Sequence, residues 1–176
     1  MNATPDWPET GRPDADNWNH KTMDLSDLVT PDAILPALKA NSKKQVLQAI
    51  AEKAALMTGV QEKDILETLI KREKLGSTGV GGGIAIPHGK LAGLERIFGL
   101  FTRLPKPIDF EALDDHPVDL IFLLLAPENA GADHLKALAR VARLFREPGV
   151  VGKLRGSSDA SALYAVLTEG ATHNAA

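Results

Sequence analysis

The sequence has no cysteine among its 176 residues. This absence excludes disulfides, thiolate nucleophiles and metal sites that are ligated by cysteine. Long apolar runs are absent too, since the longest, LIFLLLA (120–126), is far shorter than the roughly 20 residues of a membrane-spanning helix. The N-terminus also lacks the apolar segment of a secretory signal peptide. Together these absences predict a cytoplasmic protein without a membrane span or a thiol-based redox centre.

Neither sign of charge dominates, and the formal net charge is −3 at pH 7. The sequence therefore lacks the basic field that binds nucleic acids or anionic membranes. The hydrophobic fraction of 44% is ordinary for a globular protein and supports a real core. A chain of 176 residues fits one domain, because domains usually contain about 100 to 150 residues.

The first 22 residues differ from the rest of the chain in composition. They contain no leucine, isoleucine, valine or phenylalanine, but three prolines, four acidic residues and both tryptophans. Such a segment buries too little apolar surface to offset its ordering entropy, so residues 1–22 are predicted to be a disordered extension. Met23 is an alternative start residue. The predicted folded domain covers residues 23–170, and residues 171–176 are predicted to form a flexible tail.

Helical and strand patterns alternate in the predicted domain. Short continuous apolar runs at 96–104 and 118–126 are typical of central strands that are covered on both faces. Amphipathic periodicity predicts helices at 41–57, 61–76, 131–149 and 157–170. Pro148 and Gly149 are expected to stop the third helix. Because helices precede and follow the strands, we expect an α/β fold with a mixed β-sheet and helices on both of its faces.

The stretch GVGGGIAIPHGK (79–90) places several glycines directly before a proline and a histidine. A P-loop requires G-x-x-x-x-G-K-[ST], but Ile84 stands at the first glycine position and Leu91 follows Lys90. No G-x-G-x-x-G can be drawn through these glycines either. Both nucleotide-binding motifs are therefore excluded, and a glycine-rich turn is the simplest interpretation of the glycines alone.

A plain turn does not explain Pro87 and His88. Proline restricts the backbone before the histidine, and the glycines on both sides are expected to let a ligand or partner approach closely. His88 is therefore a candidate nucleophile at a strand end, although a single loop histidine is more often structural. His134 lies in the first turn of a predicted helix, where N–H groups attract anions and disfavour a protonated imidazole. Arg72 lies at the end of a predicted helix before the glycines, where a cation often only complements the helix dipole. Its planar guanidinium group, however, also suits bidentate binding of a phosphate.

The remaining histidines are weaker candidates. His20 lies in the predicted extension and His173 in the predicted tail. His116 follows Asp114 and Asp115, and these three form a conceivable metal site, but adjacent residues seldom converge on one ion. No motif requires a metal or cofactor. Two histidines and an arginine suit a phosphoryl group held on nitrogen better than they suit hydrolysis.

The string REKLGSTGVGGGIAIPHGKL (72–91) closely resembles the active-site segment of enzyme IIA proteins of the bacterial phosphoenolpyruvate-dependent phosphotransferase system (PTS), in the fructose/mannitol superfamily. Its STG-x-G-x-GIAIPHGK form is most similar to the nitrogen-regulatory branch. The resemblance continues through residues 107–145 and extends more loosely over about 23–168. One departure is Gly82, where relatives often carry asparagine, and glycine there is expected to loosen the loop.

The resemblance implies a role for each candidate residue. His88 matches the histidine that accepts a phosphoryl group from a phosphorylated histidine on a small HPr-like phosphocarrier. His134 matches a second active-site histidine that stabilises the phosphorylated state, and Arg72 matches an arginine near the phosphate. The implied fold is a mixed sheet flanked by helices. The implied protein is a phosphotransferase with a covalent phosphohistidine, which regulates target proteins through its phosphorylation state and needs no cofactor.

Two alternatives stay open. A sugar-specific IIA component would pass its phosphoryl group to a separate IIB protein in carbohydrate uptake. The sequence contains no fused IIB domain with its cysteine and no membrane domain, which favours the regulatory function. The other alternative is a binding module whose histidine is chemically inert.

Overall fold

The computed structural model describes residues 24–173, so the predicted extension at 1–22 lies outside the described residues, as do the last three residues of the predicted tail. The elements in chain order are α1 (Leu25–Leu28), the 3₁₀ turn η3 (Pro31–Ala33), β1 (Ile34–Leu35), α2 (Lys43–Thr58), α3 (Glu62–Lys74), β2 (Gly79–Gly81), β3 (Ile84–Ala85), β4 (His88–Leu91), β5 (Phe98–Ile108), β6 (Val118–Pro127), α4 (Ala132–Leu144), α5 (Pro148–Arg155) and α6 (Ala160–His173). Within the described range, none of these helices has the length and apolarity to cross a membrane.

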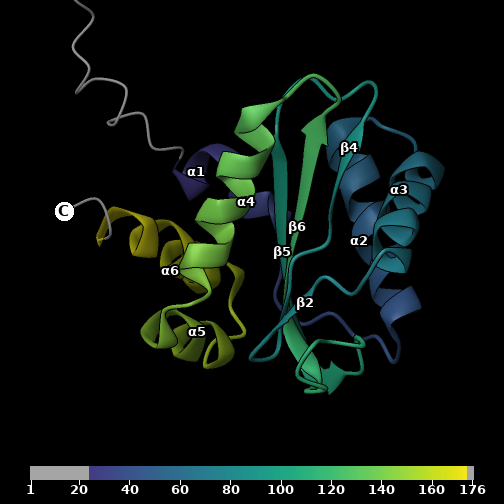
Figure 1. Cartoon of the computed structure of the whole chain (residues 1–176). Helices are drawn as coiled ribbons and strands as arrows, with labels where there is room; N and C mark the ends of the chain where they lie inside the picture. The colour runs from purple at the N-terminus through teal and green to yellow at the C-terminus, as the bar shows by residue number, and fades with distance from the viewer. Residues whose placement is uncertain (1–23, 174–176) are drawn as a thin grey trace, which may run out of the picture.

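The strands form one six-stranded mixed sheet in which β6 is central (Figure 1). The strand order is β1-β5-β6-β3-β2, and β4 also pairs with β6. The antiparallel pair of β5 and β6 forms the middle of the sheet, whereas β3 and β4 both run parallel to β6. Ile84 pairs with Leu120 and His88 with Leu124, so β4 lies further along the same side of β6 than β3.

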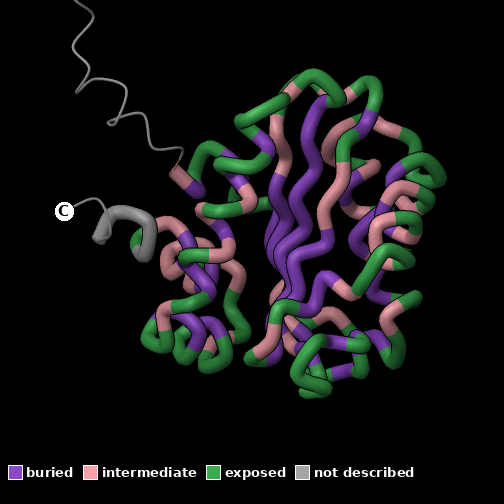
Figure 2. The backbone as a smooth tube through the Cα atoms, viewed as in Figure 1, coloured by how far each residue is buried: buried purple, intermediate pink, exposed green. Residues whose placement is uncertain are grey.

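Helices cover both faces of the sheet, with α2 and α3 on one face and α1, α4, α5 and α6 on the other (Figure 1). The core lies between these layers, and Figure 2 shows the central strands as mostly buried. Every residue of β6 except Asp119 is buried. This arrangement confirms the predicted α/β fold with a mixed sheet and two helical layers, and it confirms 118–126 as a central strand.

Local sequence signals explain the ends of α2, and packing explains the position of α3. Ser42 is the N-cap of α2, and its hydroxyl accepts a hydrogen bond from the N–H of Gln45 at 3.2 Å. The helix ends at Gly59, whose φ of 77° is a left-handed conformation that glycine adopts without strain. α3 buries Ile65 and Leu69 and packs against β4. The C-terminal turn of α3 is thereby brought beside the strand that carries the candidate histidine.

Two helical segments differ from the sequence predictions. α4 ends at Leu144, and Pro148 does not merely stop a helix but is the first residue of α5. Proline fits this position because the first residue of a helix has no intrahelical N–H bond to make. α6 runs to His173, so the first three residues of the predicted tail are still helical.

Candidate functional site

His88 is the first residue of β4 and is held by hydrogen bonds on both sides. The carbonyl oxygen of the preceding Pro87 accepts a hydrogen bond from the N–H of Leu124 on β6 at 2.9 Å. The ring Nδ1 of His88 lies 2.8 Å from the carbonyl oxygen of Ile86. Because a carbonyl oxygen only accepts, Nδ1 carries the proton and donates it. The imidazole is therefore oriented by the backbone two residues before it.

Arg72 comes from the last turn of α3 and reaches the other ring nitrogen of His88. Its Nε–H donates to Nε2 of His88 at 3.3 Å, and its Nη1 donates to the carbonyl oxygen of Gly76 at 2.7 Å. A guanidinium has donors only, so Nε2 of His88 is the acceptor in this contact. The two ring contacts together assign the neutral Nδ1–H tautomer to His88, with the lone pair of Nε2 directed at Arg72.

His134 lies in the first turn of α4 and packs beside His88. The two ring centroids are 5.8 Å apart with an interplanar angle of 55°. His134 is only 7% exposed, and within the part of the chain that the structure describes its buried Nε2 has no hydrogen-bond partner. A buried polar atom without a partner is costly. The position of Nε2 therefore fits a ligand group that arrives at the site from outside.

Both histidines are biased toward the neutral form. Burial lowers the pKa of His88 below its usual value and outweighs the opposing effect of its backbone hydrogen bond, while the charge of Arg72 lowers this pKa further. Burial is also the main cause that lowers the pKa of His134, and the charges of His88 and Lys90 act in the same direction. Nε2 of His88 is thus unprotonated at neutral pH, and its lone pair accepts the hydrogen bond from Arg72.

The glycines of the 79–83 stretch lie away from His88. Residues 81–83 form the tip of the β2–β3 hairpin, with positive φ angles between 66° and 100°. Ile84 pairs with Leu120 and His88 with Leu124, which separates the hairpin from His88 by about 13 Å at roughly 3.3 Å per residue. The expectation that these glycines provide space at His88 is therefore wrong. They serve a tight turn that other residue types would strain.

Charged side chains hold this hairpin. The N–H of Gly82 donates to the carboxylate of Asp114 at 2.9 Å, and Nη2 of Arg155 donates to the carbonyl oxygen of Gly82 at 2.6 Å. Arg155 also pairs with Asp119 at 2.9 Å. Gly82 has a φ of 66°, which asparagine also tolerates, so its departure from the family pattern concerns the hairpin. Among the side chains that the structure describes, no group of three or more metal-ligating residues is placed to hold an ion, and this includes the cluster around His116.

Gly89 is the glycine that the site requires. A Cβ atom at this position would lie 2.5 Å from Cγ2 of Thr68 on α3, closer than real Cβ atoms approach their neighbours. The absence of a side chain lets α3 lie directly against β4. This close packing brings Arg72 within hydrogen-bond distance of His88.

Sequence reasoning missed Glu73, which follows Arg72 and whose side chain is almost fully buried. Its side chain is 6% exposed, and its carboxylate lies 2.6 Å from Nζ of Lys43. It also accepts hydrogen bonds from the backbone N–H and the hydroxyl of Thr78. A signal was present in the sequence, because Glu73 lies four residues after Leu69, on the apolar side of α3. A carboxylate at such a position needs a buried partner.

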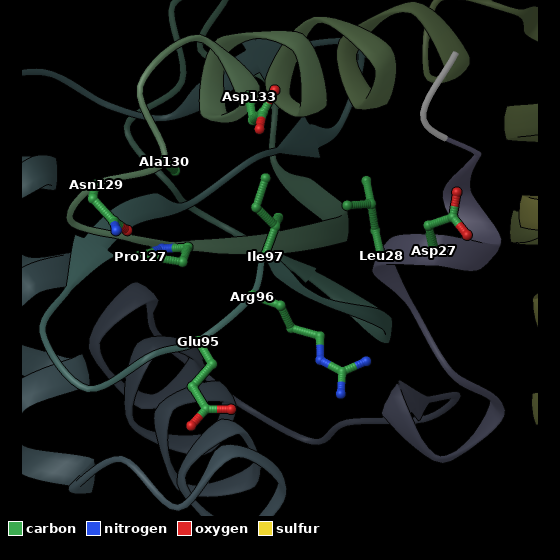
Figure 3. Close-up of a pocket in the computed structure, with 9 residues that line it drawn as sticks. All are labelled: Asp27, Leu28, Glu95, Arg96, Ile97, Pro127, Asn129, Ala130 and Asp133. Carbon is green, nitrogen blue, oxygen red and sulfur yellow. The ribbon is translucent and has the colours of Figure 1, made fainter. Parts of the chain in front are cut away.

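A separate pocket of about 400 Å³ lies at the end of β6 (Figure 3). It is lined by residues from α1, from the segment before β5 and from the turn into α4, including Asp27, Arg96 and Asp133. Neither His88, His134 nor Arg72 contributes to it. The pocket is therefore distinct from the cluster of the two histidines and the arginine.

The chain is similar to known proteins over most of its length. Residues 27–170 match the family model described as "Phosphoenolpyruvate-dependent sugar phosphotransferase system, EIIA 2". The chain is similar to a "Nitrogen regulatory protein" of Bradyrhizobium diazoefficiens, with 66% identity over 145 residues that cover 82% of this chain and 95% of the relative. It is also similar to the "Nitrogen regulatory protein" of Escherichia coli, with 38% identity over 152 residues that cover 86% of this chain and 93% of the relative.

One solved structure is similar to the chain in both fold and sequence. The nitrogen regulatory protein IIA-Ntr from Neisseria meningitidis superimposes with a TM-score of 0.78 at 37% identity, covering 82% of this chain and 99% of that protein. The region matched by the family model contains Arg72, His88 and His134 together with the whole sheet and most of the two helical layers. The chain therefore belongs to the EIIA 2 family of the phosphoenolpyruvate-dependent sugar phosphotransferase system.

Proposed function

We propose that this protein is a phosphoryl-accepting regulatory protein of the nitrogen-type PTS, phosphorylated on Nε2 of His88 by an HPr-like phosphocarrier. The observation that carries the proposal is the state of His88. Its Nδ1 proton is engaged by Ile86, while the lone pair of Nε2 faces a guanidinium. The regulatory part of the proposal is supported by the relatives named as nitrogen regulatory proteins.

In the proposed reaction, the lone pair of Nε2 attacks the phosphorus atom carried by a histidine of the phosphocarrier. A new Nε2–P bond forms while the P–N bond of the carrier breaks, and the bonding electron pair remains on the carrier's imidazole. The ring of His88 gains positive charge and keeps its Nδ1 proton, which the carbonyl oxygen of Ile86 stabilises. Such transfers depend mainly on alignment and on stabilisation of the phosphoryl oxygens.

Arg72 and His134 are placed to supply that stabilisation. Arg72 already contacts the nitrogen that would be phosphorylated, so its N–H groups lie next to the position of the incoming phosphoryl oxygens. The Nε2 atom of His134 is buried without a partner in the described part of the chain. In the tautomer that carries its proton on Nε2, His134 would donate a hydrogen bond from this atom to a phosphoryl oxygen. Because His134 is neutral, it would contribute a hydrogen bond rather than a full charge.

The surface around this site suits contact with other proteins. Leu75, close to Arg72, is 85% exposed, and Leu135, adjacent to His134, is 67% exposed. Exposed leucines beside a reactive group favour a protein partner over a small polar substrate. Phosphorylation would add roughly −1.5 to −2 charges, by analogy with phosphoserine. A charge of this size next to apolar contacts provides a physical basis for switching the binding of target proteins.

The test is phosphorylation by phosphoenolpyruvate, the upstream enzyme and a purified HPr-like carrier. The wild-type protein should acquire one acid-labile phosphoryl group, and His88→Ala should acquire none. His116→Ala serves as the matched control, because His116 has a largely exposed side chain and should be dispensable. Undiminished labelling of His88→Ala would refute the proposal.

The alternative function is that of a sugar-specific IIA component, and the description of the matched family supports it by naming a sugar phosphotransferase system. In that case the phosphorylated protein would transfer its group to a IIB protein and then to a sugar. The same labelled protein decides between the functions. Stoichiometric transfer to a purified IIB would establish the sugar-specific function, whereas phosphate retained in its presence supports regulation.

A further inference from the structure

The buried carboxylate of Glu73 collects three hydrogen-bond donors from two other segments. Lys43, at the start of α2, approaches it to 2.6 Å. Thr78 supplies both its backbone N–H, at 3.2 and 3.3 Å from the two oxygens, and its hydroxyl. Lys43 also lies 5.0 Å from the ring centroid of Phe110, and Thr78 is 3% exposed. A neutral side chain with one acceptor oxygen cannot satisfy these three donors.

Stability alone is a weak explanation for this arrangement. Burying an ion pair costs desolvation energy that its attraction often fails to recover, and apolar replacements of similar volume are frequently neutral or stabilising. The hydroxyl, the ammonium group and the carboxylate nevertheless converge within α2, α3 and the segment before β2. A buried polar cluster of this kind fixes one geometry among several that simple packing would allow.

Two hydrogen bonds connect Thr78 to His88 through Ile86. The N–H of Ile86 donates to the carbonyl oxygen of Thr78 at 3.0 Å. The carbonyl oxygen of Ile86 in turn accepts the Nδ1 proton of His88 at 2.8 Å. Ile86 is thus held at its N–H by the residue that Glu73 anchors, and it uses its carbonyl group to orient the imidazole. A displacement of Thr78 would pass through Ile86 to the ring.

Glu73 also acts on the other side of the imidazole. It follows Arg72 in the last turn of α3, so anchoring its carboxylate to Lys43 and Thr78 fixes the end of the helix from which Arg72 extends. Arg72 then needs only its own bond to Gly76 to aim Nε at His88. One carboxylate therefore controls both contacts that determine the tautomer of the histidine.

We propose that Glu73 is a positioning residue for phosphoryl transfer, which acts with Lys43 and Thr78 to hold His88 in the Nδ1–H tautomer with Nε2 presented beside Arg72. This inference rests on the proposed function for its consequence in catalysis, but its structural part concerns His88 in the free protein. The two parts therefore have separate readouts.

The experiment compares Glu73→Gln with Glu67→Gln, which makes the same chemical change at an exposed position of the same helix. The amide group of glutamine presents a donor where an acceptor is needed, so Thr78 or Lys43 must move. Ring ¹⁵N chemical shifts of His88 should show one Nδ1–H tautomer in the wild type and in Glu67→Gln, but a mixture of tautomers in Glu73→Gln. The rate of phosphoryl transfer from the phosphorylated carrier should fall on the order of tenfold to a hundredfold, as for a displaced reacting group.

Thr78→Val provides a second route if Glu73→Gln does not fold. Valine keeps the shape and the backbone N–H but removes the hydroxyl, so the shift in tautomer and rate should have the same direction and a smaller size. Native tautomer and native rate in a folded Glu73→Gln, or in Thr78→Val where only that variant folds, would overturn the proposal. If the wild-type protein accepts no phosphoryl group, the proposed function fails, while the ¹⁵N spectra still decide whether Glu73 positions the ring.

Discussion

Arg72 is the residue whose replacement tests the geometry of the site most directly. Its guanidinium makes two bonds at once, to Nε2 of His88 at 3.3 Å and to the carbonyl oxygen of Gly76 at 2.7 Å. Arg72→Ala removes both hydrogen bonds and the positive charge beside Nε2 of His88, the atom that we propose is phosphorylated. Arg72→Lys keeps the charge, but a single ammonium group cannot reproduce the planar fork that makes both contacts.

The expected loss of rate in Arg72→Ala follows from the role of a fixed hydrogen-bond donor beside charge that develops in the transition state. Loss of one such donor costs about a hundredfold to a thousandfold in rate, or about 2.7 to 4 kcal/mol of transition-state stabilisation. We therefore expect a loss of this order for Arg72→Ala and an intermediate loss for Arg72→Lys. Stability should change far less, by about 0.5 to 1.5 kcal/mol, because the lost bonds join partly exposed groups.

The assay is single-turnover transfer from the ³²P-labelled carrier, followed by quenched flow at saturating carrier concentration. Lys71→Ala is the matched control, because Lys71 is an exposed cation in the same helical turn. It removes one positive charge from the end of α3 without touching His88. Wild-type rates in Arg72→Ala, or equal losses in Arg72→Ala and Lys71→Ala, would show that the reasoning about directed contact is wrong.

Three further predictions address pH, packing and the hairpin. Because the pKa values of His88 and His134 are lowered from 6.5, the unfolded chain binds more protons as pH falls below that value, so the free energy of unfolding measured in urea should decrease toward acid pH. The phosphorylation rate should stay constant down to about pH 6.5 and fall only below it, and a fall that already begins above pH 7 would contradict the burial argument. Gly89→Ala should cost about 1 to 3 kcal/mol by overpacking, and thermal unfolding should show partial recovery in the double variant with Thr68→Ser, which lacks the clashing methyl group. Arg155→Ala should destabilise the protein by about 1 kcal/mol, yet leave phosphorylation within twofold of wild type, because its contacts lie at the glycine hairpin; a tenfold loss would place the hairpin in the reaction after all.

The sequence predicted best those elements whose signals are local. The helix at α2 follows from its apolar periodicity, and β6 follows from a continuous apolar run. The predicted stop at Pro148 is wrong because proline can either follow the end of a helix or begin one, and local sequence does not say which applies. α4 ends at Leu144, and Pro148 begins α5. Elements of two to four residues, such as β3 and β4, exist because they pair with β6, and this pairing is a property of the whole sheet.

The residues of the candidate site also differ in how far the sequence predicts them. The residues alone indicate His88, His134 and Arg72 as a set that suits a phosphoryl group, and the family resemblance implies a role for each. The structure places His88 in contact with each of the other two. The prediction that residues 79–83 provide space at His88 rests on their closeness in sequence. The pairing of Ile84 with Leu120 and of His88 with Leu124 instead separates the glycine hairpin from His88. Glu73 was not predicted as part of the site, although its position on the apolar side of α3 indicates a buried carboxylate that needs a partner. A polar residue on an apolar helix face is therefore as informative as a motif, provided that the question of its partner is asked.

Under the proposed function, moderate stabilisation of the phosphoryl group has a physical reason. Donor and acceptor are both histidines, so a P–N bond is broken and a P–N bond of the same kind is formed, and the transfer is nearly balanced. Additional cations would stabilise the phosphorylated form and hinder its return to the free state. The site provides the guanidinium of Arg72 and, near His134, the charge of Lys90, while burial is the main cause that lowers the pKa of His134 and favours its neutral form. This arrangement orients the phosphoryl group without trapping it, which a reversible signal requires and a permanent store of phosphate does not.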